Sequence, residues 1–144
     1  MNYLDSSALI KRFVEEKGSE RVRKIVEEEG PVATAKIAYA EIHSGLARKK
    51  REGHLSSDRY ALICRQVELD WDAYVRMDLT DEVLSLARAL IQRHPLRGFD
   101  AIHLASALIL KANTGEQVTF TGADMRQLQA AVKEKLVSVN VETA

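Results

Sequence analysis

Short apolar segments alternate with longer stretches of helical periodicity along the chain, and this alternation constrains the fold more than any other feature of the sequence. Strands are predicted at residues 2–4, 31–35, 72–79, 118–121 and 136–141. Between them, apolar side chains recur with the spacing of amphipathic helices. Short strands that alternate with helices are typical of a parallel sheet covered by helices. The sequence therefore predicts an α/β sandwich in which helices predominate.

The predicted helices begin at hydroxyl or acidic residues, which are favoured caps, and several end at glycine. Ser6 or Ser7 is expected to cap the first helix, which ends near Gly18. The later helices are predicted at residues 19–29, 34–51, 56–67, 80–91, 100–111 and 124–135. Residues 100–111 are apolar on almost every side, which indicates a buried helix. Because no low-complexity segment or linker interrupts the pattern, residues 1–144 are expected to form a single domain.

The charge balance bears on the class of partner. Lys and Arg together number 21, as do Asp and Glu, so the formal net charge is zero. This argues against a protein that coats nucleic acid through a global basic field, although a local basic rim is compatible with it. The single Cys64 cannot form an internal disulfide, and no Cys and His cluster has zinc-site spacing. With no signal-peptide pattern and no membrane-length apolar run, a reducing cytoplasm is expected.

Four acidic residues stand at strand ends or on helix faces close to the predicted core. Asp5 follows the first predicted strand, and Asp124 repeats this arrangement after a later one. Asp100 opens the buried helix, and Glu41 lies at the border of the apolar stripe of its helix. Open α/β sheets build their sites beyond the carboxyl ends of their strands. Helix capping is the alternative role for the aspartates, and contact with solvent is the alternative for Glu41.

Together the four carboxylates indicate a cation site. Two like charges about 5 Å apart repel by roughly 3 kcal/mol at an effective dielectric constant of 20, so such a cluster is a poor structural choice. Oxygen ligands suit Mg²⁺ or Mn²⁺, and Mg²⁺ is typically held by one or two carboxylates, waters and substrate phosphates. Such an ion polarises a phosphoryl oxygen and activates a bound water, which a free carboxylate can orient. The cluster therefore points to phosphodiester chemistry.

Four segments of the chain resemble the motifs of the PIN-domain family, and specifically of its VapC-type ribonuclease toxins. They are Tyr3–Leu9, Tyr39–Ile42, Asp100–Ala105 and Thr121–Asp124. Their order and spacing fit the family, as does the chain length, and the resemblance covers nearly the whole chain. It implies a PIN-like three-layer α/β/α sandwich with a short, mainly parallel central sheet.

The resemblance also implies an activity and partners. The implied activity is that of a metal-dependent endoribonuclease, which hydrolyses RNA phosphodiester bonds at an acidic centre that binds Mg²⁺ or Mn²⁺. Asp5, Glu41, Asp100 and Asp124 match the acidic positions, and Ser7 matches a hydroxyl residue that helps to order the site. Such toxins pair with a small VapB-like antitoxin, whose C-terminal segment lies in an apolar groove and enters the active site. They commonly form homodimers.

One motif departs from the family pattern. Ser or Thr often stands close before the fourth acid, whereas here Gly122 and Ala123 follow Thr121. This departure puts in question the supporting role of Thr121 and the placement of Asp124.

Basic residues and one histidine are secondary candidates. Arg48, Lys11 and Arg97 lie near the expected site and are candidate contacts for RNA phosphates. The run 48–51 also suits a solvated helix end, where cations are favoured. His103, three residues after Asp100, is interpreted as a hydrogen-bonded core histidine, with a catalytic base as the alternative.

Two other functions compete with the nuclease. A haloacid dehalogenase-like phosphatase also places an aspartate after its first strand, but its chemistry needs a second acid two residues later, where this chain has Ser7. A PIN-like scaffold that has lost activity would serve as a protein-binding module. The four acids argue against that scaffold, and Gly122 leaves it open.

Overall fold

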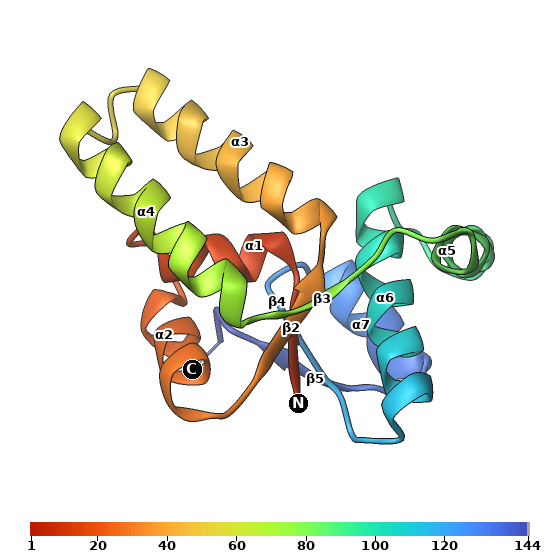
Figure 1. The fold of residues 1–144 in the computed structure, drawn as a ribbon. Helices are drawn as coiled ribbons and strands as arrows, with labels where there is room; N and C mark the ends of the chain where they lie inside the picture. The colour runs from red at the N-terminus through yellow and green to blue at the C-terminus, as the bar shows by residue number, and fades with distance from the viewer. Residues whose placement is uncertain (144) are drawn as a thin grey trace.

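The computed structural model describes residues 1–143 and places a five-stranded sheet at their centre (Figure 1). The strands are β1 (Asn2–Leu4), β2 (Val32–Ala35), β3 (Val75–Met77), β4 (Thr119–Gly122) and β5 (Val137–Asn140). Their order is β3-β2-β1-β4-β5, and every neighbouring pair is parallel. In the central strand, Tyr3 is aligned with Ala33 on one side and with Phe120 on the other. The predicted α/β class and parallel sheet are therefore confirmed.

Helices cover both faces of the sheet (Figure 1). They are α1 (Ser6–Leu9), α2 (Ser19–Glu28), α3 (Ile37–Arg51), α4 (Ser57–Ala73), α5 (Asp81–Arg93), α6 (Gly98–Thr114) and α7 (Met125–Lys133). Along β1 the side chains alternate between the two faces. Tyr3 joins the core under α5, α6 and α7, whereas Leu4 joins the core under α1 to α4. The predicted three-layer sandwich is confirmed in this way.

The order of the strands determines where a site can form. The chain passes from β1 to β2 and β3 on one side of the sheet, whereas β4 and β5 lie on the other side of β1. The direction of winding thus reverses between β1 and β4, and open α/β sheets bind ligands in the crevice beyond the carboxyl ends of the strands at such a point. Asp5 follows β1, and Asp124 caps α7 directly after β4. Both acids therefore lie at this crevice.

The first helix is much shorter than predicted. It ends at Leu9 and continues only as a 3₁₀ turn over Ile10–Arg12. The hydroxyl of Ser19 then stabilises a loop, because it donates to the carbonyl of Val14 (2.9 Å) and accepts from the amide of Glu16 (2.9 Å). Val14 is buried in this loop without being helical, so its apolar spacing does not signal a longer helix.

The fourth helix is longer than predicted, and the strand after it is shorter. Helix α4 continues to Ala73, because Ile63, Val67 and Trp71 bury one stripe at four-residue spacing. The strand expected at 72–79 is reduced to β3 at the edge of the sheet.

Two other helix starts differ from the prediction. Helix α3 starts at Ile37 instead of Thr34, because Thr34 belongs to β2 and its hydroxyl donates to the carbonyl of Leu4 (2.7 Å). Helix α6 starts at Gly98, so that Asp100 is its third residue.

A close approach between α3 and the 3₁₀ turn brings the candidate site together. A Cβ atom on Gly45 would lie 2.5 Å from Cδ1 of Ile10, so a larger residue at position 45 would force the Ile10 side chain to move. Within residues 1–143, none of the helices combines the length and the apolar character needed to cross a bilayer.

Candidate metal centre

Asp5 is buried at the junction of β1 and α1. Its side chain caps α1 by accepting the amide of Ala8 (2.9 Å), so the cap is Asp5 and not Ser6 or Ser7. The Ser7 hydroxyl donates to both carboxylate oxygens, at 2.8 and 3.0 Å, as expected of a residue that orders the site. Burial raises the pKa of Asp5, and the Asp100 carboxylate adds to this rise, although His103 and the two donors oppose it. Desolvation thus disfavours the charged form of Asp5, and His103, Ala8 and Ser7 partly offset this effect.

Glu41 projects from α3 toward α6 instead of into solvent alone. Its Oε1 lies 2.8 Å from Nε2 of His103, and Nδ1 of the same ring lies 2.8 Å from the hydroxyl of Tyr3. The interpretation of His103 as a hydrogen-bonded core residue is therefore confirmed. The acid that His103 contacts is Glu41. The sequence signal for His103 is its place one helical turn after Asp100, and Tyr3 gives no signal of its own.

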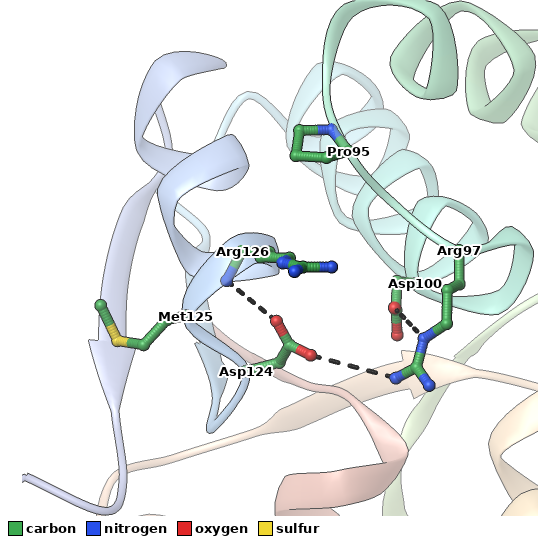
Figure 2. Close-up of a pocket in the computed structure, with 6 residues that line it drawn as sticks. All are labelled: Pro95, Arg97, Asp100, Asp124, Met125 and Arg126. Carbon is green, nitrogen blue, oxygen red and sulfur yellow. Dashed lines mark hydrogen bonds and ion pairs between the residues drawn. The ribbon is translucent and has the colours of Figure 1, made fainter.

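Asp100 and Asp124 face each other across one hollow, with Arg97 between them (Figure 2). Nε of Arg97 lies 3.2 Å from Oδ2 of Asp100, and one terminal nitrogen lies 3.9 Å from Oδ2 of Asp124. Oδ1 of Asp124 caps α7 by accepting the amides of Arg126 (2.9 Å) and Gln127 (3.2 Å). The Arg97 side chain is 83% exposed, so a cation that binds the carboxylates can displace it.

Adjoining hollows connect three of the acids, Glu41, Asp100 and Asp124. Asp100 and Asp124 line one, Asp100 and Glu41 line a second, and Glu41 lines a third together with Ser7. Phe99 lines both hollows beside Glu41 and is 60% exposed. This aromatic residue was missed from the sequence, where an exposed Phe and a core Phe look alike.

The departure at Gly122 leaves one side of Asp5 open. A Cβ on Gly122 would lie 3.5 Å from Oδ1 of Asp5, which is ordinary contact, so glycine keeps space beside the carboxylate. Thr121 gives no side-chain support, because its buried hydroxyl has no hydrogen-bond partner among residues 1–143. Its carbonyl instead accepts the amide of Asp5 (3.3 Å).

The residues present fit a hard divalent cation in part. The donors are all carboxylate oxygens, and the guanidinium of Arg97 stands in as the countercharge. No three acidic, His or Cys side chains within residues 1–143 are close enough together to hold one ion at once. Mg²⁺ needs only one or two direct carboxylates, because it keeps several of its waters. The arrangement therefore fits an ion with mixed carboxylate and water ligation.

The basic candidates differ in their accessibility. Lys11 is 5% exposed, and its ammonium pairs with Glu142 (2.9 Å) and Glu16 (3.2 Å). These pairs engage Lys11 within the fold and hold the C-terminal segment against the 3₁₀ turn, so Lys11 does not present a free phosphate contact. Arg48 is exposed at the hollow that contains Glu41, and Arg97 is exposed at the neighbouring one.

Comparisons with known proteins agree with the fold. The model of the PIN domain matches residues 3–130. Ribonuclease VapC45 of Mycobacterium tuberculosis (strain CDC 1551 / Oshkosh) is 35% identical over 106 residues, which cover 74% of each chain. The structure of FitAcB from Neisseria gonorrhoeae matches with a TM-score of 0.67 and 16% identity, covering all of both chains. A toxin-antitoxin complex from Klebsiella pneumoniae matches with a TM-score of 0.63 and 16% identity, covering 89% of this chain and 90% of that one. The chain therefore belongs to the PIN-domain family.

Proposed function

We propose that this protein is an endoribonuclease that hydrolyses RNA phosphodiester bonds with Mg²⁺ or Mn²⁺ and is neutralised by a cognate antitoxin. The observation that carries the proposal is the position of Asp5, Asp100 and Asp124 at the winding reversal of the sheet, with a displaceable arginine between two of them. The related ribonuclease supports the class of reaction. An inactive scaffold would have no need to keep the desolvated charge of Asp5.

The site residues divide the work in this proposal. Asp5 and Asp100 would hold the cation, and Asp124 and Glu41 would reach it directly or through water. The bound cation would supply Lewis acidity at the scissile phosphate and a water of lowered pKa. Oδ2 of Asp124 accepts neither of the cap hydrogen bonds, so it is available to orient the attacking water. Ser7 would keep the Asp5 carboxylate in one orientation.

Substrate contacts would come from the exposed basic rim. When the cation takes over the carboxylates, the guanidinium of Arg97 becomes free to bind a phosphate oxygen, for which its planar fork is suited. Arg48 would contact a neighbouring phosphate across the hollow that contains Glu41. A rim of this kind suits a chain with zero net charge, since the attraction is local.

An antitoxin segment fits the same region. A hollow of about 630 Å³ beside α1, the 3₁₀ turn and α3 is lined by apolar side chains such as Ile10 and Phe99 and by charged ones, including Glu41. An extended segment with apolar side chains and one basic side chain would match it, and that basic group would compete with the cation for the acids. The similar fold in a toxin-antitoxin complex supports this type of partner. We also propose a homodimer, to be checked by sedimentation equilibrium.

The decisive experiment is cleavage of a panel of labelled RNAs with Mg²⁺ or Mn²⁺. Cleavage is expected for the wild type and is expected to vanish in Asp5→Asn, in Asp100→Asn and with excess EDTA. Asp58→Asn is the matched control, because this exposed acid lies in the first turn of α4.

Each alternative has its own outcome in that experiment. Cleavage that persists in both variants and in EDTA would contradict the metal-dependent nuclease. A folded wild type that binds no Mn²⁺ and cleaves no RNA would favour the scaffold. Hydrolysis of a phosphomonoester without cleavage of RNA would favour the phosphatase.

A further inference from the structure

We infer that Tyr3 and His103 are positioning residues for Glu41, because their hydrogen bonds hold one oxygen of this carboxylate and leave the other for the cation. The inference rests on the proposed function and names residues that the acidic motifs do not include. The chain of contacts runs from the Tyr3 hydroxyl to Nδ1 of His103 (2.8 Å) and from Nε2 of His103 to Oε1 of Glu41 (2.8 Å).

The direction of these hydrogen bonds follows from the groups themselves. An ionised carboxylate only accepts, so Nε2 of His103 must carry the proton that is donated to Glu41. In a neutral ring the other nitrogen then accepts, and the Tyr3 hydroxyl is its donor. The carboxylate thus selects the tautomer with an N–H on Nε2, and the Tyr3 hydroxyl stabilises that tautomer by donating to Nδ1. An acceptor at position 103 in place of this N–H would repel the carboxylate.

The chain is anchored in rigid parts of the fold. Tyr3 is fully buried in the central strand, and its ring stacks on Phe120 with centroids 5.5 Å apart and planes 14° from parallel. His103 is 2% exposed in α6, edge-on to Tyr3 at 5.9 Å. Glu41 belongs to α3, whose apolar residues pack on the opposite face of the sheet. The hydrogen bonds therefore tie an acid from one layer to the buried helix of the other.

Glu41 does not need His103 as a structural partner. Its side chain is 26% exposed, so water could hydrogen-bond both of its oxygens. Burying a histidine and a tyrosine hydroxyl to meet an accessible acid is a costly way to stabilise a core. A free Glu side chain loses conformational freedom when it is immobilised. The hydrogen bond from His103 orders the Glu41 side chain before the cation binds, so cation binding does not include that loss of freedom.

The test measures Mn²⁺ affinity by calorimetry in the metal-free protein, and not only activity. His103→Leu is expected to weaken Mn²⁺ binding about 10- to 100-fold, the usual effect of losing a group that orients a metal ligand. His103→Gln is expected to restore most of it, since the amide N–H of glutamine can replace Nε2–H. Tyr3→Phe keeps the stacked ring and is expected to weaken binding by a smaller factor.

A second measurement reads the tautomer directly. Long-range ¹H–¹⁵N correlation spectra of the metal-free wild type are expected to show His103 with its proton on Nε2. The matched control is His94→Leu, which removes the contact between a partly buried histidine and Glu134 (2.6 Å), away from the four site acids. This control is expected to lower the melting temperature and leave Mn²⁺ affinity unchanged.

Three results would overturn the inference. The first is a proton on Nδ1 of His103. The second is a wild type that binds Mn²⁺ while Tyr3→Phe binds it with the same affinity, as does His103→Leu where that variant folds. In that case the proposed function stands without these two residues. The third is a wild type that binds no Mn²⁺, which defeats the proposed function and this inference together.

Discussion

The Ser7 hydroxyl donates to both oxygens of the Asp5 carboxylate, at 2.8 and 3.0 Å, from the first turn of the helix that Asp5 caps. A two-residue separation across a strand-to-helix junction thus fixes the orientation of a buried charge. Only one other donor, the amide of Ala8, reaches the Asp5 carboxylate among residues 1–143. Ser7 therefore supplies half of the groups that hold this acid.

Replacement of Ser7 by alanine is expected to weaken Mn²⁺ binding about 10-fold, the lower end of the effect of removing a group that orients a metal ligand. Because the hydroxyl opposes the rise in the pKa of Asp5, its loss is expected to shift the pH dependence of binding upward. Calorimetric titration across pH 5–8 measures both effects. Ser7→Thr should retain binding, and a 10-fold loss in the neighbouring Ser6→Ala as well would assign the effect to the turn rather than to the hydroxyl.

Asp5→Asn is expected to stabilise the metal-free protein while it abolishes metal binding. Burial raises the folded-state pKa of Asp5, so the ionised acid destabilises the fold at neutral pH, and this cost grows as pH rises from about 3.9, the ordinary value, through the folded-state pKa. An amide keeps the cap acceptor without the charge. For a domain of this size, the melting temperature typically rises by roughly 2–4 °C for each kcal/mol added to the free energy of unfolding. Thermal unfolding in EDTA at pH 3 and pH 7 checks this, and a variant less stable than wild type at pH 7 would contradict it.

The contribution of Glu134 to stability changes with pH in the opposite direction to that of Asp5, and Glu134 lies away from the four site acids. Partial burial acts to raise its pKa, but hydrogen bonds from Arg93 (3.0 Å) and His94 (2.6 Å) outweigh that effect and lower it. The resulting stability is present above the unfolded-state pKa, about 4.3, and is lost as pH falls through the lower folded-state pKa. Glu134→Gln is expected to be less stable than wild type at pH 7 and to approach it at pH 3, as measured by urea unfolding. A constant difference across this range would show that the charge is not responsible.

The acids of the site were predictable because their signals are local. Asp5 and Asp124 each follow a short apolar segment and precede a helical pattern, and chain order alone places both at strand ends. The contact of Glu41 with His103 joins residues 62 positions apart, and that of Tyr3 with His103 joins residues 100 positions apart. Pairings of this kind depend on the strand order and on the crossing of α6 over the sheet, which no local pattern encodes.

The errors of the sequence prediction have a shared physical cause. The prediction inferred helix ends and the exposure of side chains from residue type, whereas tertiary contacts determine both. Ser19 ends the first helical region by bonding to the carbonyl of Val14, and Lys11 is withdrawn from solvent by Glu16 and Glu142. Glu142 arrives from the far end of the chain, so nothing near Lys11 predicts its burial.

Arg97→Gln is expected to separate metal binding from RNA cleavage. Loss of the competing guanidinium should leave Mn²⁺ affinity equal or higher, whereas kcat/KM for RNA should fall about 10-fold or more, because a charge-assisted hydrogen bond to a phosphate is lost. Arg88→Gln, an exposed arginine on α5, is the matched control. A parallel loss of metal and RNA binding in Arg97→Gln would instead make Arg97 part of the support of the acids.

Phe99→Ala is expected to weaken RNA binding and to leave metal binding intact. The ring is 60% exposed beside Asp100 and lines both hollows that flank Glu41, so it offers a free aromatic face within reach of a bound single strand. Stacking of one base on an aromatic side chain is worth about 1–3 kcal/mol, which predicts a roughly 5- to 150-fold loss of affinity in Phe99→Ala and little change in Phe99→Trp. Fluorescence anisotropy with the non-cleaving Asp100→Asn background measures it, and Leu69→Ala on α4 controls for loss of an exposed apolar group. Equal affinities for Phe99→Ala and its parent would show that the exposed ring does not stack on the RNA.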